Sequence, residues 1–150
     1  MPSSFKDVKK ILLPTDGSDS SIRAAEYGVN IAKILGAQIV AVYIIDDVVL
    51  DEARAFFKAG EQEDVERKLR QAGQRYINYV LSLAEKEGVK AACLIAKGIP
   101  FEQIVNLTDK SNMDMVVMGT HGRRGTERIL IGSVAERVIE YSSCPVLVVK

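Results

Sequence analysis

Five short apolar stretches, separated by amphipathic stretches with helical spacing, constrain the fold of this chain most strongly. The stretch QIVAVYII is rich in β-branched residues, and KILLP and PVLVV are short and apolar, which is typical of strands. The five lie at residues 10–14, 38–45, 90–96, 113–118 and 145–149. Between them, apolar residues recur every three or four positions, the period of a helix with one buried face. Strands that alternate with helices in this way predict parallel β-α-β units.

Several of the apolar stretches contain unbroken runs such as ILL, VV and VLVV. Such runs predict strands buried on both faces, as in a sheet covered by helices on both sides. The predicted fold class is therefore α/β, with an open, doubly wound, five-stranded parallel sheet. A chain of 150 residues suits a single domain over 1–150. Residues 46–60, where apolar side chains stand among acids, predict either a short helix or a lid.

Composition narrows the classes of function. Lysine and arginine number 20, as do aspartate and glutamate, and this balance argues against nucleic acid as a partner. Cys93 and Cys144 form no C-x-x-C pair and stand beside apolar residues, which predicts small buried side chains. A single histidine excludes a His-rich metal site. No apolar run approaches the ~18 residues that span a bilayer, and no leader pattern precedes the first strand, which predicts a cytoplasmic protein with no membrane partner.

The loops after the first and fourth strands are the unusual ones. In open parallel sheets, ligands bind beyond the carboxyl ends of the strands, where the strand order reverses. Residues 15–21 (TDGSDSS) are rich in helix-capping types. After the fourth strand come Gly119-Thr-His-Gly122, nine residues, and then Gly132-Ser133 at the start of the last helix. Glycines allow close backbone approach, and a helix N-terminus favours anions, so this segment suits phosphate.

Each of these features also has a purely structural interpretation. Ser133-Val-Ala-Glu136 matches an S-x-x-E capping box, which needs no ligand. Asp16, Ser18 or Asp19 can cap the helix that follows the first strand. The glycines can be ordinary turn residues. Taken singly, the motifs leave both interpretations open.

The complete spacing is more specific than its parts. Gly119-x2-Gly122-x9-Gly132-Ser133 matches the G-x2-G-x9-G-[ST] pattern of the ATP-binding branch of the universal stress protein family. The resemblance begins at KILLPTDGS, continues through KGIP and MDMVVMGTHG, and ends with GSVAERVIEYSSCPVLVVK, so it covers nearly the whole chain. The chain resembles UspA-like proteins, which implies a Rossmann-like fold of the adenine nucleotide alpha hydrolase type with ATP as its ligand.

The resemblance also implies roles for single residues after the first two strands. Asp16 would lie near the phosphates or hold their metal, Mg²⁺ or Mn²⁺, while Pro14 and Thr15 shape the turn. A carboxylate beside phosphates needs an intervening cation, and Mg²⁺ commonly joins one or two carboxylates to substrate phosphates. Val42 would meet the adenine through its backbone.

The fourth strand and last helix would supply the remaining contacts. By the same resemblance, Met118 and Gly119 would border the ribose and adenine. The phosphates would be contacted by Gly122, Gly132, Ser133 and Val134.

His121, Arg123, Arg124 and Arg128 stand at the start of the nine-residue excursion and within it. They predict either an ordinary solvated loop or a flap whose charged groups approach the phosphates. His121 as a general base has no evident orienting partner in the sequence.

Three functions fit these motifs. The first is a nucleotide-dependent sensor or switch in a stress response, with at most slow hydrolysis of ATP. The second is a ligand-free dimeric interaction module. The third, an ATP-cleaving enzyme, is suggested by the turn GSDS, which resembles half of the S-G-G-x-D-S loop of ATP pyrophosphatases, but Thr15 and Asp16 replace the first two positions. A Walker A loop is absent.

The last strand predicts self-association. The apolar run from Pro145 to Val149 would form an edge of the sheet, and proteins usually pair or cover such an edge. Family members that this chain resembles commonly form dimers through that strand. We expect a homodimer built by antiparallel pairing of this strand.

Overall fold

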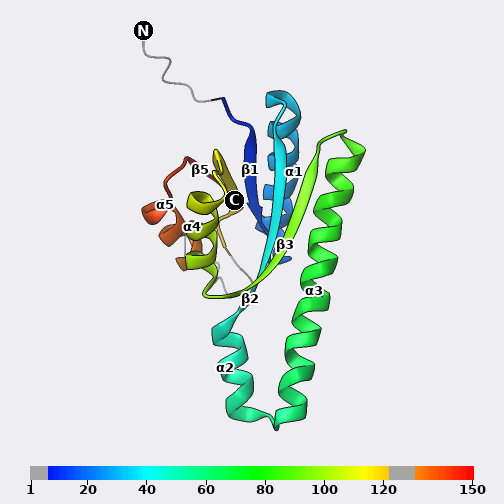
Figure 1. The fold of residues 1–150 in the computed structure, drawn as a ribbon, viewed down its shortest axis with the longest axis vertical. Coiled ribbons are helices and arrows are strands. Elements are labelled where there is room, and N and C mark those ends of the chain that lie inside the picture. Colours follow the sequence, from blue (N-terminus) through cyan, green and yellow to red (C-terminus); the bar gives the residue numbers. More distant parts are fainter. Residues whose placement is uncertain (1–6, 122–130) are drawn as a thin grey trace.

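One parallel sheet organises the molecule (Figure 1). The structure, a computed structural model, describes residues 7–121 and 131–150. The strands stand in the order β3-β2-β1-β4-β5, and every neighbouring pair is parallel. They are β1 (Lys10–Pro14), β2 (Gln38–Asp46), β3 (Ala91–Gly98), β4 (Met115–Gly119) and β5 (Val146–Val149). The predicted fold class, an open, doubly wound, five-stranded α/β sheet, is confirmed.

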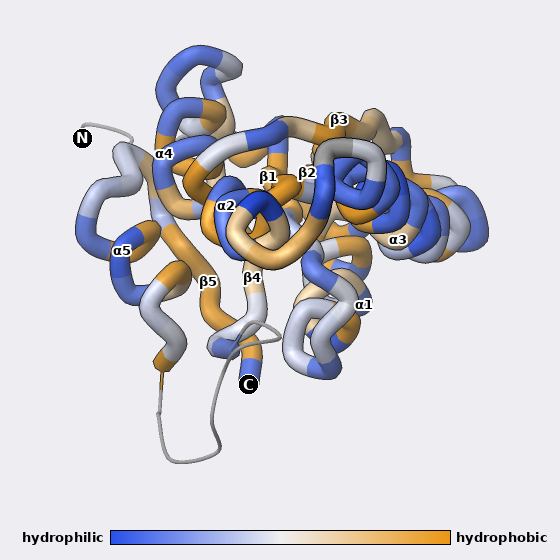
Figure 2. The backbone as a smooth tube through the Cα atoms, turned by 90° about the horizontal axis from the view of Figure 1, so that it is seen from below, coloured by the Kyte–Doolittle hydropathy of each residue, from blue (hydrophilic) through white to orange (hydrophobic). Residues whose placement is uncertain are grey.

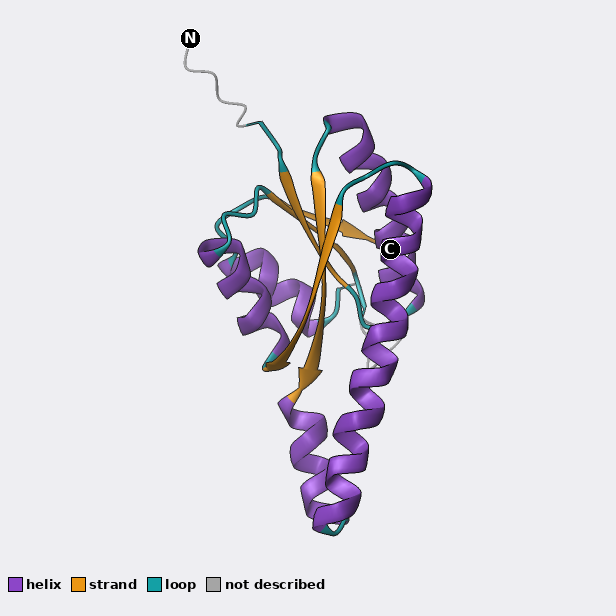
Figure 3. Cartoon of the chain, turned by 45° about the vertical axis from the view of Figure 1, so that its right-hand side comes forward, coloured by secondary structure: helices purple, strands orange, loops and turns teal. Residues whose placement is uncertain are grey.

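Helices connect the strands and cover both faces of the sheet (Figure 3). They are α1 (Asp19–Leu35), α2 (Asp47–Phe56), α3 (Ala59–Lys86), α4 (Pro100–Lys110) and α5 (Ser133–Tyr141). Helices α1 and α3 lie on one face, and α4 and α5 lie on the other. Helix α2 and the first half of α3 form a hairpin that extends past the carboxyl edge of the sheet. Most of 46–60 is therefore the short helix α2, one of the two predicted forms.

The central position of β1 explains why Ile11, Leu12 and Leu13 are all apolar. Ile11 and Leu13 pack into the cluster formed with α1 and α3, whereas Leu12 packs into the cluster formed with α4 and α5. All three side chains are fully buried. Because successive side chains of a strand point to opposite faces, both faces of β1 must be apolar. Each such side chain contributes about 1.5–3 kcal/mol through burial.

Local chemistry sets the ends of the helices. Ser18 caps α1, because its Oγ accepts a hydrogen bond from the Ser21 N–H at 3.3 Å. Helix α1 therefore begins inside the segment 15–21 that the sequence predicts as a turn. Gly36 ends α1 with a φ of 66°, and Gly88 follows α3 with a φ of 70°, both in the left-handed region that glycine adopts readily.

Two predictions about burial are wrong, both at the edges of the sheet. Cys93 is exposed and Cys144 is partly exposed, although both were expected to be buried; both are free thiols. Leu147, in the run VLVV, is 38% exposed. Strands β3 and β5 are the outermost strands, so each has a neighbour on one side only and less helix above it. The edge position of β5 was predicted from the sequence and is confirmed, whereas the edge position of β3 was not predicted.

Within residues 7–121 and 131–150, no helix combines the length and apolar character that crossing a membrane requires.

Candidate functional site at the carboxyl edge

The strand order reverses between β1 and β4. Strand β1 pairs with β2 on one side and with β4 on the other, so the loops that leave β1 and β4 emerge next to each other. Figure 2 looks onto this edge, with the end of β4 beside the start of α1. The expectation that the two unusual loops meet at a switch point is confirmed. Open α/β sheets hold ligands at such a place.

Serine hydroxyls join the two loops. Ser20 Oγ donates to the carbonyl oxygen of His121 at 2.7 Å, and Ser18 Oγ donates to the same oxygen at 3.1 Å. The His121 N–H lies 3.3 Å from Ser20 Oγ. These bonds fix the loops relative to each other through side chains, beyond the end of the sheet ladder.

Buried hydroxyl groups gather at this edge. Among the described residues, the buried polar side chains are those of Thr15, Ser20, Ser21, Thr108 and Thr120. Thr15 and Thr120 follow β1 and β4, and Ser20 and Ser21 lie in the first turn of α1. Burying a hydroxyl is unfavourable unless it forms a hydrogen bond. Here Thr15 Oγ1 lies 3.4 Å from Ser21 Oγ, and Thr120 Oγ1 lies 3.0 Å from Nδ1 of His121. The carboxyl edge is therefore lined by hydrogen-bonded hydroxyl groups, whereas the two faces of the sheet pack into apolar clusters.

The turn after β1 places Asp16 at this edge. Its Oδ1 accepts the Ser18 N–H at 2.9 Å, which closes a tight turn through Gly17, whose φ is 78°. Among the described residues, no group of three or more Asp, Glu, His or Cys side chains is arranged to hold a metal ion. A cation at Asp16 would therefore depend on one carboxylate plus oxygen atoms of a ligand, an arrangement that suits Mg²⁺.

Pro14, Thr15 and Val42 lie together where β1 ends. Pro14 is buried, and the Thr15 N–H donates to the carbonyl oxygen of Val42 at 2.9 Å. The Val42 side chain is 1% exposed and belongs to the core. The side chain of Val42 is therefore not available to a ligand, and a contact of its backbone with adenine stays a prediction.

Met118 and Gly119 end β4 beside α1. The Met118 side chain is 6% exposed and packs into the cluster under α4 and α5, so its side chain does not line the edge. A Cβ on Gly119 would lie 2.4 Å from Ser20 Oγ and 2.7 Å from the Ser21 backbone nitrogen. Glycine at this position is required by the close approach of α1, whether or not a ligand binds.

The start of α5 returns to the same edge, because the Gly132 N–H donates to the carbonyl oxygen of Thr120 at 2.6 Å. The predicted capping box is wrong: Gly132 is the cap residue, Ser133 is the first residue of the helix, and no side chain caps this end. Ser133 is exposed, and Val134 packs partly into the core. The N–H groups of this helix start thus lie near the loops of β1 and β4, and within residues 7–121 and 131–150 no side chain caps them.

The edge gathers most of the predicted site residues. Gly122, Arg123, Arg124 and Arg128 lie outside the described residues, so their roles stay predictions. The sequence analysis missed Ser20 and Thr120, whose buried hydroxyls are the strongest polar feature of the edge. A hydroxyl-rich stretch such as DSS directly after a strand is the signal that could have identified Ser20.

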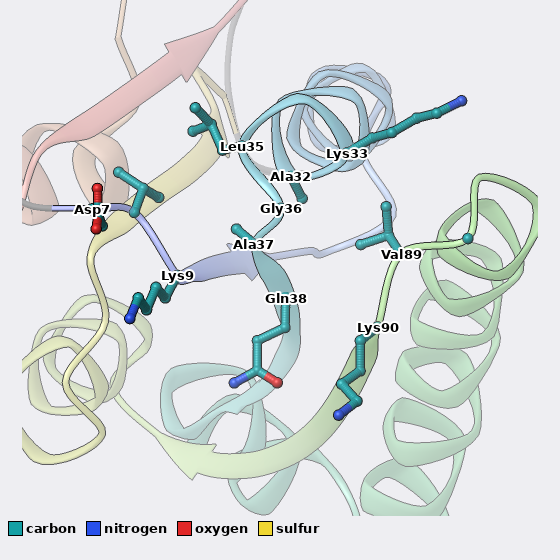
Figure 4. Close-up of a pocket in the computed structure, with 12 residues that line it drawn as sticks. Asp7, Lys9, Ala32, Lys33, Leu35, Gly36, Ala37, Gln38, Val89 and Lys90 are labelled. Carbon is teal, nitrogen blue, oxygen red and sulfur yellow. The ribbon is translucent and has the colours of Figure 1, made fainter.

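A pocket of about 810 Å³ lies at the opposite edge, between the amino ends of β1 and β2 and the C-terminal ends of α1 and α3 (Figure 4). Lys9, Gln38 and Lys90 extend toward one side of it, and Lys33 points away from them. Helix C-termini carry partial negative charge, which disfavours phosphate. None of the predicted site residues lines this pocket.

The fold and the polar carboxyl edge define a doubly wound α/β domain of the class that holds small ligands at the switch point. The model of the universal stress protein family matches residues 7–150. Universal stress protein MJ0531 of Methanocaldococcus jannaschii is 44% identical over 142 residues, which cover 95% of this chain and 82% of that protein. The chain belongs to the universal stress protein family.

Two solved structures extend the comparison. The structure of hypothetical protein MJ0577, from the same organism, has a TM-score of 0.83 and 30% identity over 97% of both chains. A universal stress protein in complex with cAMP has a TM-score of 0.71 and 24% identity, covering 97% of this chain and 99% of that one. At 24% identity, the similarity to the protein in complex with cAMP concerns the fold alone.

Proposed function

We propose that this chain binds ATP, together with Mg²⁺ or Mn²⁺, at the carboxyl edge of its sheet. The observation that carries the proposal is the junction of two loops and one uncapped helix start at the switch point, where Ser18 and Ser20 bind the backbone of His121. Backbone N–H groups and an uncapped helix start suit phosphates, and Asp16 suits their metal. The complex of a related fold with cAMP supports an adenine nucleotide as the ligand class.

The proposed role is a cytoplasmic, nucleotide-dependent switch in a stress response. A ligand shifts a conformational equilibrium only by its differential affinity for the two states, so binding without rapid turnover is sufficient for a switch. We therefore propose at most slow hydrolysis of ATP.

Calorimetric titration of nucleotide-stripped protein tests the proposal. ATP with Mg²⁺ is expected to bind with micromolar affinity, about −8 kcal/mol, and GTP more weakly. Absence of heat with ATP, AMP and cAMP, together with no thermal shift, would contradict it.

Gly132→Val tests the phosphate end of the site. Gly132 has a φ of −68° and a ψ of 160°, which any residue adopts, so valine adds bulk without backbone strain. ATP affinity is expected to fall by at least about tenfold because the side chain would occupy the phosphate position. Gly60→Val is the matched control, because a Cβ at Gly60 meets no atom within 4 Å. Equal ATP affinity in the two variants would contradict the assignment of Gly132.

We also propose a homodimer through β5. This strand is an edge of the sheet, and Leu147 on it is 38% exposed, which favours pairing with a second copy. Leu147→Lys is expected to convert the dimer into a monomer in sedimentation experiments. Leu94→Lys is the control, since Leu94 is 41% exposed on the opposite edge strand β3. Dissociation caused only by Leu94→Lys would contradict pairing through β5. A monomeric wild type would contradict both that pairing and the alternative of a ligand-free dimeric module.

A further inference from the structure

We propose that Tyr76 of α3 is a positioning residue for the phosphate and metal end of the nucleotide site. The inference rests on the proposed function, and it adds a residue that comes from neither of the two loops. In the sequence, the spacing of Tyr76 indicates only the apolar face of a helix. In the structure, its ring determines the shape of the turn that carries Asp16.

The contact between Tyr76 and Gly17 is direct. A Cβ placed on Gly17 would lie 2.3 Å from Cζ of Tyr76 and 2.4 Å from its Cε1, so the hydroxyl end of the ring fills the space beside this glycine. Gly17 has a φ of 78°, a conformation that glycine adopts at little cost. The ring therefore closes one side of the turn, and the turn holds its conformation against a fixed surface. Asp16 Oδ1 bonds to the Ser18 N–H across this same turn.

A second tyrosine holds Tyr76 in place. The rings of Tyr43 and Tyr76 meet edge to face, with centroids 5.9 Å apart and planes at 67°. The Tyr43 ring lies against Gly73, one helical turn before Tyr76, where a Cβ would lie 2.0 Å from Cδ1 of Tyr43. Because Tyr43 directly follows Val42 in β2, this pair connects the strand of the predicted adenine contact with the turn of the predicted metal contact.

This arrangement predicts that the two ends of the site are held by different contacts. The Val42 end is held by the sheet ladder, through the bond from Thr15 N–H to the Val42 carbonyl oxygen. The Asp16–Ser18 turn lies beyond the ladder and depends on Tyr76 for its second wall. Loss of the ring is therefore expected to weaken contacts to the β- and γ-phosphates and their metal, and to leave contacts to the nucleoside intact. Displacement of site residues by fractions of an ångström is sufficient for such a loss.

Titrations of the full chain with Mg·ATP and with AMP separate the two ends. For Tyr76→Leu, the dissociation constant of Mg·ATP is expected to rise about tenfold, while that of AMP changes by less than about twofold. Tyr76→Phe, which keeps the ring, is expected to retain the wild-type affinity for Mg·ATP. Tyr79→Leu is the matched control, because Tyr79 lies on the same helix but is 39% exposed and donates to Glu26 at 3.3 Å.

Two outcomes would overturn the inference. One is an unchanged affinity of Tyr76→Leu for Mg·ATP, and the other is an equal loss for AMP and Mg·ATP, which would indicate general damage to the fold. Hydrogen exchange of the Gly17 and Ser18 amides in the nucleotide-free protein gives an independent readout. Exchange is expected to accelerate in Tyr76→Leu and not in Tyr79→Leu. If the wild type binds neither nucleotide, the proposed function fails, and unchanged exchange in Tyr76→Leu would then reject the positioning role separately.

Discussion

At the scale of single residues, Gly119 lies where the end of β4 touches the first turn of α1. A Cβ there would meet backbone atoms of Ser20 and Ser21 at 2.7 Å, and backbone cannot move aside as a flexible side chain can. Gly119→Ala is expected to lower the free energy of unfolding by about 1–3 kcal/mol. Urea denaturation measures this. Gly60→Ala, at a position open to solvent, is the control, and equal stability of both variants would contradict the packing constraint at Gly119.

Asp16 combines a structural role with the proposed metal role, and two substitutions separate them. Asp16→Asn keeps an oxygen that can accept the Ser18 N–H and removes the charge, whereas Asp16→Ala removes both. The asparagine variant is expected to lose the effect of Mg²⁺ on ATP affinity while its stability changes by less than about 0.5 kcal/mol. The alanine variant is expected to lose a further 0.5–1.5 kcal/mol or so of stability with the hydrogen bond. Calorimetry with and without Mg²⁺ measures this effect. If Mg²⁺ still changes the ATP affinity of Asp16→Asn, the assignment of the metal to Asp16 is contradicted.

At the scale of elements, a salt bridge joins the C-terminal ends of α1 and α3. Lys33 Nζ lies 2.7 Å from Oε2 of Glu87. The hydrogen bond from Lys33, and then its charge, hold the pKa of the Glu87 carboxyl below its ordinary value of 4.5. A carboxyl whose pKa is lower in the folded state stabilises the fold above its unfolded pKa, and this stabilisation is lost as the pH falls through the folded pKa.

The expected signature of this pair is therefore an acid-dependent stability difference. Wild type is expected to be more stable than Glu87→Gln at pH 7, and the difference is expected to shrink below pH 4.5 and to disappear in stronger acid. Both side chains are partly exposed, so the effect is small and is reduced by salt. Urea unfolding at a series of pH values measures it, with Lys33→Met as the variant that should abolish the difference. A difference that grows in acid would contradict the assignment.

At the scale of the whole molecule, the proposed ligand at the carboxyl edge would contact the loops after β1 and β4 and the start of α5, which separate when the sheet unfolds. A ligand that binds only the folded chain stabilises it by about 2.7 kcal/mol at one hundred times its dissociation constant. For a chain of this size, that corresponds to a rise in Tm of about 5–10 °C. Differential scanning fluorimetry with Mg·ATP measures the shift. Gly132→Val, with affinity expected to fall by at least about tenfold, should show a shift reduced by about half or more, and a shift equal to that of the wild type would indicate binding elsewhere.

The features that could be predicted from the sequence depend on neighbours along the chain. The period of the apolar residues indicated the strands and helices, and the order of these elements implied the parallel sheet. The glycine pattern correctly directed attention to the loops after β1 and β4. Each of these features follows from the conformational preferences of single residues or from the spacing of residues a few positions apart.

The features that only the tertiary structure decided depend on residues distant along the chain. Cys93 is exposed because β3 ends the sheet, a position that the sequence did not indicate. Gly119 is required by Ser20, about a hundred positions away, and Tyr76 reaches Gly17 from another helix. Contacts of this kind form only when several elements pack together. The pattern of residues along the chain does not indicate which side chains will then be in contact. Local preferences therefore determined what the elements are, whereas packing decided which atoms form the site.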